Sequence, residues 1–222
     1  QVKCWGANSA GQLGYGTISN NITTLPANLP TLNFGLGVSV KKIFVGSGQT
    51  CVITSLDQVK CWGFNSSGQL GTGTQIDIST TPDLVPVVDL GAPGRTPKDF
   101  GQGLSANTCV IFDDNSAKCW GANSSSSVGL DTSTTRLTSP WTLNFLNFGS
   151  SVGVKYIETS VHRSCAALTN NTVKCWGNND NGELGLGNSS AIKTLTQTSE
   201  INLGENLITD RVYLGKSTTV NG

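Results

Sequence analysis

The sequence predicts an all-β protein of the β-propeller type, built of blades that each hold four short antiparallel strands. Three features predict it: a long internal repeat, frequent turn residues and cysteines at a constant spacing. The 222 residues include 27 glycines, seven prolines and no methionine. Abundant glycine, serine, threonine and asparagine favour short strands and tight turns over long helices.

The repeat is marked by the tetrapeptide Lys-Cys-Trp-Gly, which occurs at residues 3–6, 60–63, 118–121 and 174–177. Its tryptophans are therefore 57, 58 and 56 residues apart. A period of this length and regularity is typical of a propeller blade, which buries its two faces by stacking against its neighbours. We expect the four tryptophans to pack between blades: Trp5, Trp62, Trp120 and Trp176.

Further landmarks follow each tetrapeptide in a fixed order. An asparagine-containing turn leads into Gly-Gln-Leu-Gly or a close variant at residues 11–14, 68–71 and 182–185, whereas the third copy reads Ser-Ser-Val-Gly at 126–129. A threonine- and proline-rich stretch comes next, then an apolar strand and a strand that begins near a cysteine. Turn residues separate these segments, so each repeat predicts about four strands.

The chain begins and ends inside a repeat. Residues 212–220 align with residues 43–51, and Val220 stands where the aligned strand has Cys51. The two half-repeats together make one blade, which gives about four blade equivalents. We therefore expect residues 1–222 to form a single propeller domain or a fragment of a larger propeller, within a longer polypeptide.

Six of the seven cysteines form pairs that are 10 residues apart, with turn residues midway. In a hairpin centred on that turn the two cysteines lie opposite each other, at a Cα separation compatible with a disulfide. Buried reduced thiols are the alternative, and a zinc site is disfavoured because the chain has one histidine and no Cys-x2-Cys. Cys4 is predicted to be free or to pair outside this chain. The predicted disulfides are Cys51–Cys61, Cys109–Cys119 and Cys165–Cys175.

The recurring cysteine, Lys-Cys-Trp-Gly, asparagine and Gly-Gln-Leu-Gly pattern resembles the regulator of chromosome condensation repeat family, especially its secreted, cysteine-bearing branch. The resemblance covers essentially the whole chain. It implies a propeller, usually of seven blades, and the four blade equivalents here depart from that number. It does not imply one function: members include an exchange factor for a small GTPase, a bacterial inhibitor of β-lactamases and a plant ultraviolet photoreceptor.

Charge and motifs exclude several function classes. Lysine plus arginine equals aspartate plus glutamate at 14 each, so nucleic acid is not an expected partner. No apolar stretch is long enough to span a membrane. Residues 215–218 match only the end of a phosphate-binding loop, residues 178–183 only vaguely resemble a calcium loop, and His162 has no identifiable catalytic partner. We expect no enzymatic activity, no cofactor and no metal.

Five Asn-x-Ser/Thr sequons fall in predicted turns or loops, where a glycan can project. Together with paired cysteines they predict a secreted or cell-surface glycoprotein. The leading hypothesis is an extracellular interaction or structural module, and its sharper version is head-to-tail self-assembly through the terminal half-blades into a fibre or surface layer. The alternatives are an intracellular, exchange-factor-like regulator and a loop-mediated inhibitor or lectin-like binder. The candidate glycosylation sites are Asn21, Asn65, Asn123, Asn170 and Asn188.

Overall fold

The computed structural model describes residues 1–130, 132–190, 195–201, 203–204 and 208–214. Its regular elements are short strands and three single-turn 3-10 helices, as expected for a chain rich in glycine and proline. In chain order they are β1 (Gly6–Asn8), β2 (Ser19–Ile22), η1 (Pro26–Asn28), β3 (Val40–Val45), β4 (Gln49–Thr54), β5 (Val59–Gly63), β6 (Pro97–Phe100), β7 (Asn107–Phe112), β8 (Ala117–Ala122), β9 (Arg136–Leu137), η2 (Pro140–Thr142), β10 (Val154–Thr159), β11 (Arg163–Leu168), β12 (Val173–Gly177) and η3 (Leu195–Gln197).

The strands form antiparallel sheets that follow the sequence repeat. Their orders are β1-β2, β3-β4-β5, β6-β7-β8-β9 and β10-β11-β12, so every sheet joins neighbours in sequence. Within the described residues, only the sheet that begins with β6 has four regular strands. In the sheet of β3, β4 and β5, an isolated bridge between Gly63 and Ile78 takes the place of a fourth strand. The segment that follows contains prolines, which have no amide proton for a continuous hydrogen-bond ladder.

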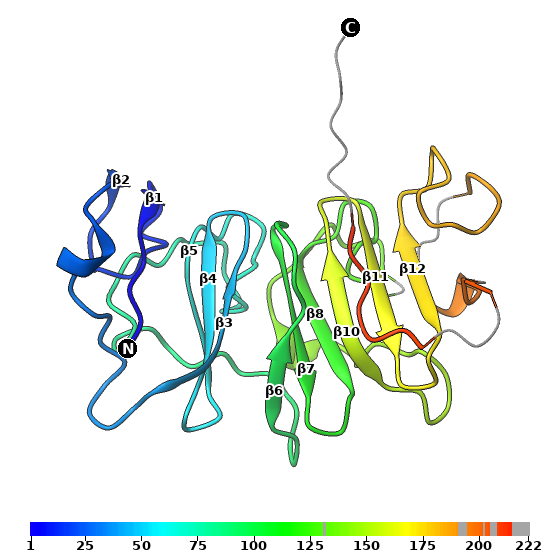
Figure 1. Ribbon diagram of the computed structural model, residues 1–222, viewed down its shortest axis with the longest axis horizontal. Helices are drawn as coiled ribbons and strands as arrows, with labels where there is room; N and C mark the ends of the chain where they lie inside the picture. The colour runs from blue at the N-terminus through cyan, green and yellow to red at the C-terminus, as the bar shows by residue number, and fades with distance from the viewer. Residues whose placement is uncertain (131, 191–194, 202, 205–207, 215–222) are drawn as a thin grey trace, which may run out of the picture.

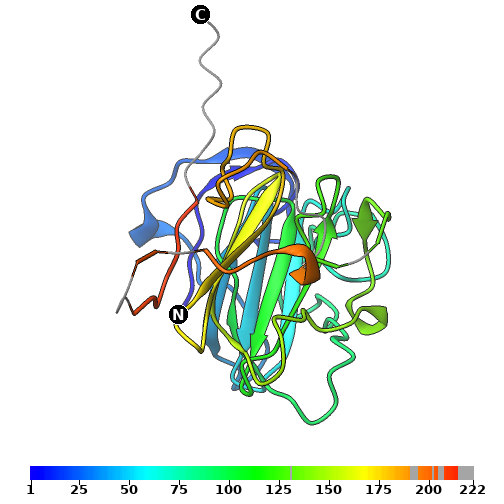
Figure 2. The ribbon, with the colours of Figure 1, turned by 90° about the vertical axis from the view of Figure 1, so that its right-hand side faces the viewer.

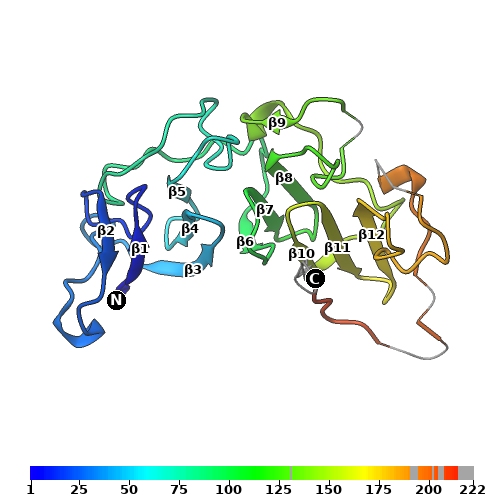
Figure 3. The same cartoon turned by 90° about the horizontal axis from the view of Figure 1, so that it is seen from above.

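The sheets stand side by side along an arc (Figure 1), and the view from above shows that this arc is open (Figure 3). The first strands of neighbouring sheets are joined directly. Lys42 on β3 pairs with Asp99 on β6 at 2.7 Å, and the backbone of Gln102 bonds to Ile157 and Thr159 on β10. The structure therefore confirms the predicted all-β, antiparallel, blade-by-blade architecture.

The core lies between the sheets rather than inside any one of them. Figure 2 looks along the row and shows the successive sheets overlapping, with loops at both ends of the strands. The side chains of Trp62, Trp120 and Trp176 are fully buried there. Aromatic pairs bridge neighbouring elements, such as Phe44 and Phe100 with ring centroids 5.8 Å apart. Such packing is the main stabilising term available to short strands.

Candidate functional site

Each of the three complete hairpins is closed by a disulfide across its two strands. The pairs Cys51–Cys61, Cys109–Cys119 and Cys165–Cys175 lie in register, each with a Cα separation of 4.1 Å. All six side chains are buried. The hairpin turns use a left-handed residue at the tip, which is Asp57, Asn115 or Asn171, and aspartate and asparagine tolerate that conformation best among residues with a side chain.

Cys4 is the remaining cysteine and carries a free thiol. Its side chain is partly buried, and burial raises the pKa of the Cys4 thiol above its usual range. The backbone amide and carbonyl of Cys4 both bond to the hydroxyl of Tyr15, at 3.2 and 3.0 Å. Those bonds fix the segment that carries the thiol at the first end of the arc.

Each blade is joined to the one before it by a repeated contact, here called the clasp. In the clasp, the repeat tryptophan and a threonine or serine both donate hydrogen bonds to one main-chain carbonyl of the preceding repeat. The indole nitrogen of Trp62 donates to the carbonyl of Gln12 at 3.0 Å, and the Thr50 hydroxyl donates to the same oxygen at 2.8 Å. Trp120 and Thr108 meet the Gln69 carbonyl in the same way, and Trp176 and Ser164 meet the Ser127 carbonyl. Because the acceptor is main chain, the third repeat keeps the clasp although its Gly-Gln-Leu-Gly has become Ser-Ser-Val-Gly.

Trp5 differs from the other three repeat tryptophans. Its side chain is 58% exposed, whereas Trp62, Trp120 and Trp176 are fully buried. In those three the clasp acceptor lies about 50 residues earlier in the chain. Packing between blades is therefore confirmed for Trp62, Trp120 and Trp176 and stays a prediction for Trp5.

A second repeated device is an asparagine that holds the turn after each Trp-Gly. The side-chain oxygen of Asn65 accepts from the Leu70 amide at 2.9 Å, and its nitrogen donates to the carbonyls of Thr74 and Ile76. Equivalent bonds are made from the same position in the other three repeats, by Asn8, Asn123 and Asn179. The tetrapeptide pattern predicts the turn, but only the structure shows that this side chain is its anchor.

This device corrects two of the five predicted glycosylation sites. Asn65 is fully buried and Asn123 is 3% exposed, and in both the amide nitrogen that a glycan would modify donates to backbone carbonyls. The folded chain has no room for a sugar on either nitrogen. Asn21, Asn170 and Asn188 are exposed, so the fold leaves these three sequons accessible.

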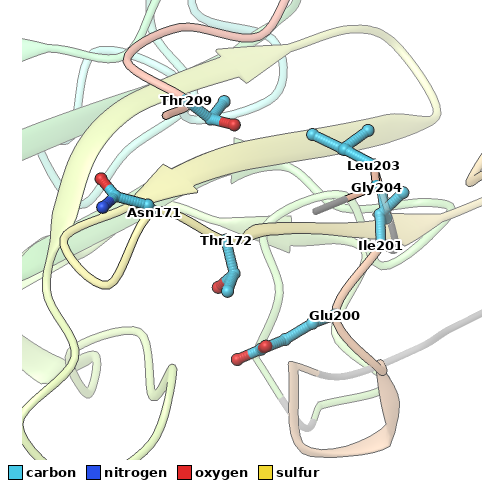
Figure 4. Close-up of a pocket in the computed structure, with 7 residues that line it drawn as sticks. All are labelled: Asn171, Thr172, Glu200, Ile201, Leu203, Gly204 and Thr209. Carbon is cyan, nitrogen blue, oxygen red and sulfur yellow. The ribbon is translucent and has the colours of Figure 1, made fainter. Parts of the chain in front are cut away.

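Asn170 stands at the tip of the β11–β12 hairpin, where the Thr172 hydroxyl donates to its side-chain oxygen at 2.8 Å. A shallow pocket of about 350 Å³ lies beside this tip (Figure 4). The labelled side chains of Asn171, Thr172 and Glu200 approach it from the hairpin and from the segment after η3. Its lining is mixed polar and apolar.

The lysine of each tetrapeptide holds an outer loop. Lys118 is 2% exposed, and its ammonium group donates to the carbonyls of Leu90, Gly91 and Pro140 at 2.9 to 3.2 Å. Burial lowers the pKa of Lys118 from its usual value. Lys60 donates to Pro82 and Asp83 in the same manner. In the sequence this lysine is visible only as part of the repeated tetrapeptide.

The concave side carries a polar recess of about 700 Å³ along β3, β6 and β10. Its charges are matched: Lys42 pairs with Asp99, and Lys155 lies 3.4 Å from Asp210. Elsewhere the ring nitrogen Nδ1 of His162 lies 3.0 Å from the Ser125 hydroxyl at an exposed position. In the described part of the chain, no three histidine, cysteine or acidic side chains are grouped as a metal site would require, and no helix is long and apolar enough to cross a membrane.

Sequence comparisons identify the repeat. The profile of the "Regulator of chromosome condensation (RCC1) repeat" matches residues 1–53, and a second profile of the same repeat matches residues 40–69 and 154–183. The chain is 31% identical over 137 residues to the ultraviolet-B receptor UVR8 of Arabidopsis thaliana, which covers 62% of the chain and 29% of the receptor. It is 27% identical over 187 residues to the human probable E3 ubiquitin-protein ligase HERC6, covering 83% of the chain and 17% of the ligase.

Solved structures show the same fold at low identity. Yeast RCC1 (Prp20), crystallised with Kap60, superposes with a TM-score of 0.67 at 18% identity over 89% of this chain and 43% of that one. Human WBSCR16 gives a TM-score of 0.54 at 16% identity, over 88% of this chain and 61% of that one. The chain thus spans less than a third of either curated relative and less than two thirds of either structure. With its four landmark copies and blade-by-blade sheets, the chain carries the regulator of chromosome condensation repeat and has the β-propeller architecture of these solved structures.

Proposed function

We propose that this chain is a non-catalytic protein-binding module that works outside the cell. One observation carries the proposal: every complete blade has its own buried hairpin disulfide. Structural disulfides persist in oxidising compartments and are rare where thioredoxin and glutathione keep thiols reduced. A chain that keeps one such pair in each of three blades is suited to a secreted or cell-surface setting.

The binding role is supported by the scaffold. Clasps and disulfides hold the sheets, whereas the Thr/Pro-rich loops that vary between repeats lie at the surface, where recognition residues are usually placed. Among solved relatives, Prp20p from Saccharomyces cerevisiae has been characterised for its binding to Gsp1p and histones. The neutral charge of this chain does not favour a histone-like or nucleic-acid partner, so the proposal is limited to protein partners of its loops.

Two finer features belong to the same proposal. We place N-linked glycans at Asn21, Asn170 and Asn188, the three exposed sequons. We also treat residues 1–222 as one propeller unit that continues the arc of a larger ring, because the chain covers 43% of the Prp20 chain on which it superposes.

The location is tested on intact cells that make the protein naturally. A membrane-impermeant amine reagent should label its exposed lysines, such as Lys41 and Lys42, or the protein should be recovered from the medium. An abundant cytosolic protein serves as the unlabelled control. Labelling that requires cell lysis would overturn the extracellular proposal and favour an intracellular regulatory propeller.

A further inference from the structure

The loop after β9 presents a half-exposed indole to solvent. This is Trp141 in η2, whose side chain is 42% exposed. The strand β9 that precedes it lies on the outer side of the arc, opposite the inner strands β3 and β10 (Figure 3). Tryptophan is highly buried on average in folded proteins, and where it is accessible on a loop it is a preferred anchor for ligands.

The fold does not require a tryptophan at this position. The same proline-containing turn, closed by a hydrogen bond from its fourth amide to its first carbonyl, occurs at residues 25–28, 81–84 and 139–142. The third residue of this turn is Ala27 in the first copy, Asp83 in the second and Trp141 in the third. Because a small residue and an acidic residue form the same turn, the indole is dispensable for folding of the loop and free for another role.

Trp141 is fixed at both ends. Its backbone lies against Gly91, where a Cβ would be 2.6 Å from the Trp141 Cα, and the carbonyl of Pro140 before it accepts from the Lys118 ammonium at 3.2 Å. The far end of the ring lies against Gly73 of the preceding repeat, where a Cβ would be 2.7 Å from the indole Cη2. The side chain therefore spans the junction of two repeats, and a ring held in this way loses little conformational entropy on binding.

Hydroxyl groups gather where the end of the indole meets Gly73. Thr72 and Thr74 flank this glycine, and their hydroxyl oxygens are 3.1 Å apart. The Gly73 amide donates to the Thr138 carbonyl at 2.9 Å, and the Thr138 hydroxyl lies 3.3 Å from that of Ser139. Ser139 Oγ is 3.5 Å from the place that a Cβ on Gly73 would take. These four side chains are exposed or partly exposed and uncharged, and each hydroxyl can both donate and accept.

We propose that Trp141 and these hydroxyls form a subsite for a neutral pyranose sugar. A pyranose with equatorial hydroxyls has a flat face of C–H bonds and a rim of hydroxyl groups. The C–H face stacks on the indole, whose π-face carries negative charge density, and the rim hydroxyls exchange hydrogen bonds with the threonines and Ser139.

An anionic sugar is the poorer ligand for this subsite. The ammonium group beneath the loop is that of Lys118, which is 2% exposed and already donates to the carbonyls of Leu90, Gly91 and Pro140. It therefore has no remaining N–H for a carboxylate or sulfate at the surface, because an ammonium group has three donors. Sugar binding at this loop is an activity in addition to the protein binding proposed above and does not depend on it.

Saturation-transfer NMR of the purified chain with cellotetraose, a neutral glucose oligomer, tests the subsite, and tetragalacturonate is the charged counterpart. We expect transfer mainly to the ring protons of one pyranose face, with a dissociation constant on the order of 1 mM for one sugar ring. Trp141→Ala should weaken binding at least about tenfold, and it should keep the fold because Ala27 occupies this place in the first copy of the turn. Trp5→Ala removes another exposed indole and should leave binding unchanged.

Two glycine variants test whether the position of the ring matters. Gly73→Ala places a methyl group against the indole and should weaken binding of cellotetraose. Gly187→Ala adds the same group at a similar φ of +72°, with nothing within 4 Å, and should not.

Three results would overturn the subsite. They are no transfer to cellotetraose at about 10 mM, well above the expected dissociation constant, transfer that Trp141→Ala leaves unchanged, and preferential binding of tetragalacturonate. A protein partner that requires Trp141, in the absence of transfer to cellotetraose, would assign the indole to that partner instead. None of these results bears on where the protein is located, which the labelling of intact cells decides separately.

Discussion

Single side chains decide whether the turn after each Trp-Gly holds. At Asn65 the anchoring side chain satisfies one buried amide and two carbonyls, because its amide group carries an acceptor oxygen and two N–H donors on one short side chain. Its position was visible in the sequence pattern, but two copies also read as glycosylation sequons. Burial separates the two roles: the same Asn-Ser-Ser sequence anchors the turn at Asn65 and is an exposed sequon at Asn188.

Replacing Asn65 by alanine should lower the free energy of unfolding by about 2–4 kcal/mol, because the buried Leu70 amide and the carbonyls of Thr74 and Ile76 lose their partner. Asn21→Ala, at an exposed sequon, should change it by less than about 0.5 kcal/mol. Denaturant unfolding with the disulfides intact measures both. Equal effects would refute the anchoring role.

Cys4 should react slowly with iodoacetamide in the native protein, because burial raises its pKa and the thiolate is the nucleophile. The rate should increase with pH around a midpoint above about 8.5, the value of an unperturbed thiol. Unfolding in urea without reductant gives the control, in which the midpoint returns to that value. A native midpoint at or below it would contradict the burial of this thiol.

Among the structural elements, the hairpins could be predicted from the sequence, whereas the clasps could not. The spacing of the cysteines and the turn residues between them places each hairpin from sequence alone. The clasp joins a main-chain carbonyl to a tryptophan about 50 residues away, and a carbonyl leaves no mark in the sequence. In the sheet of β3, β4 and β5 a full fourth strand was overpredicted: the described residues form only an isolated bridge at Ile78, because proline and threonine in the outer loop give a strand-like pattern without a hydrogen-bond ladder.

The clasp predicts a contrast between two glycines with the same backbone conformation. Gly71 has φ +72°, and a Cβ there would lie 2.7 Å from the Trp120 indole nitrogen. Gly37 has φ +73° and nothing within 4 Å of that position. Gly71→Ala should therefore cost about 1–3 kcal/mol more than Gly37→Ala, which bears only the left-handed backbone penalty. Thermal unfolding of both variants measures the difference, and no difference would show that the clasp contact is loose.

Over the whole molecule, stability is distributed among repeats that each contact only their neighbours. Removing one disulfide with the paired change Cys109→Ser and Cys119→Ser should cost about 2–3 kcal/mol, from the lost restraint on the unfolded chain. Calorimetry of the variant against the unmodified chain checks this. An unchanged unfolding temperature would contradict this prediction and show that the disulfide adds no stability to the sheet.

The blade-by-blade sheets and the repeat family were accessible from the sequence because the repeat is written four times. The difference between Trp5 and the three buried repeat tryptophans was not, since all four stand in the same tetrapeptide. The exposed fraction of an indole depends on the segments that lie against it, and the tetrapeptide does not record them.

A non-reducing peptide map of the protein isolated from its natural source tests whether it is an extracellular protein with disulfide-bonded hairpins. We expect the links Cys51–Cys61, Cys109–Cys119 and Cys165–Cys175. We also expect glycan mass at one or more of Asn21, Asn170 and Asn188, with Asn65 and Asn123 bare. Free thiols in the hairpins, or glycans on the two buried asparagines, would contradict these expectations.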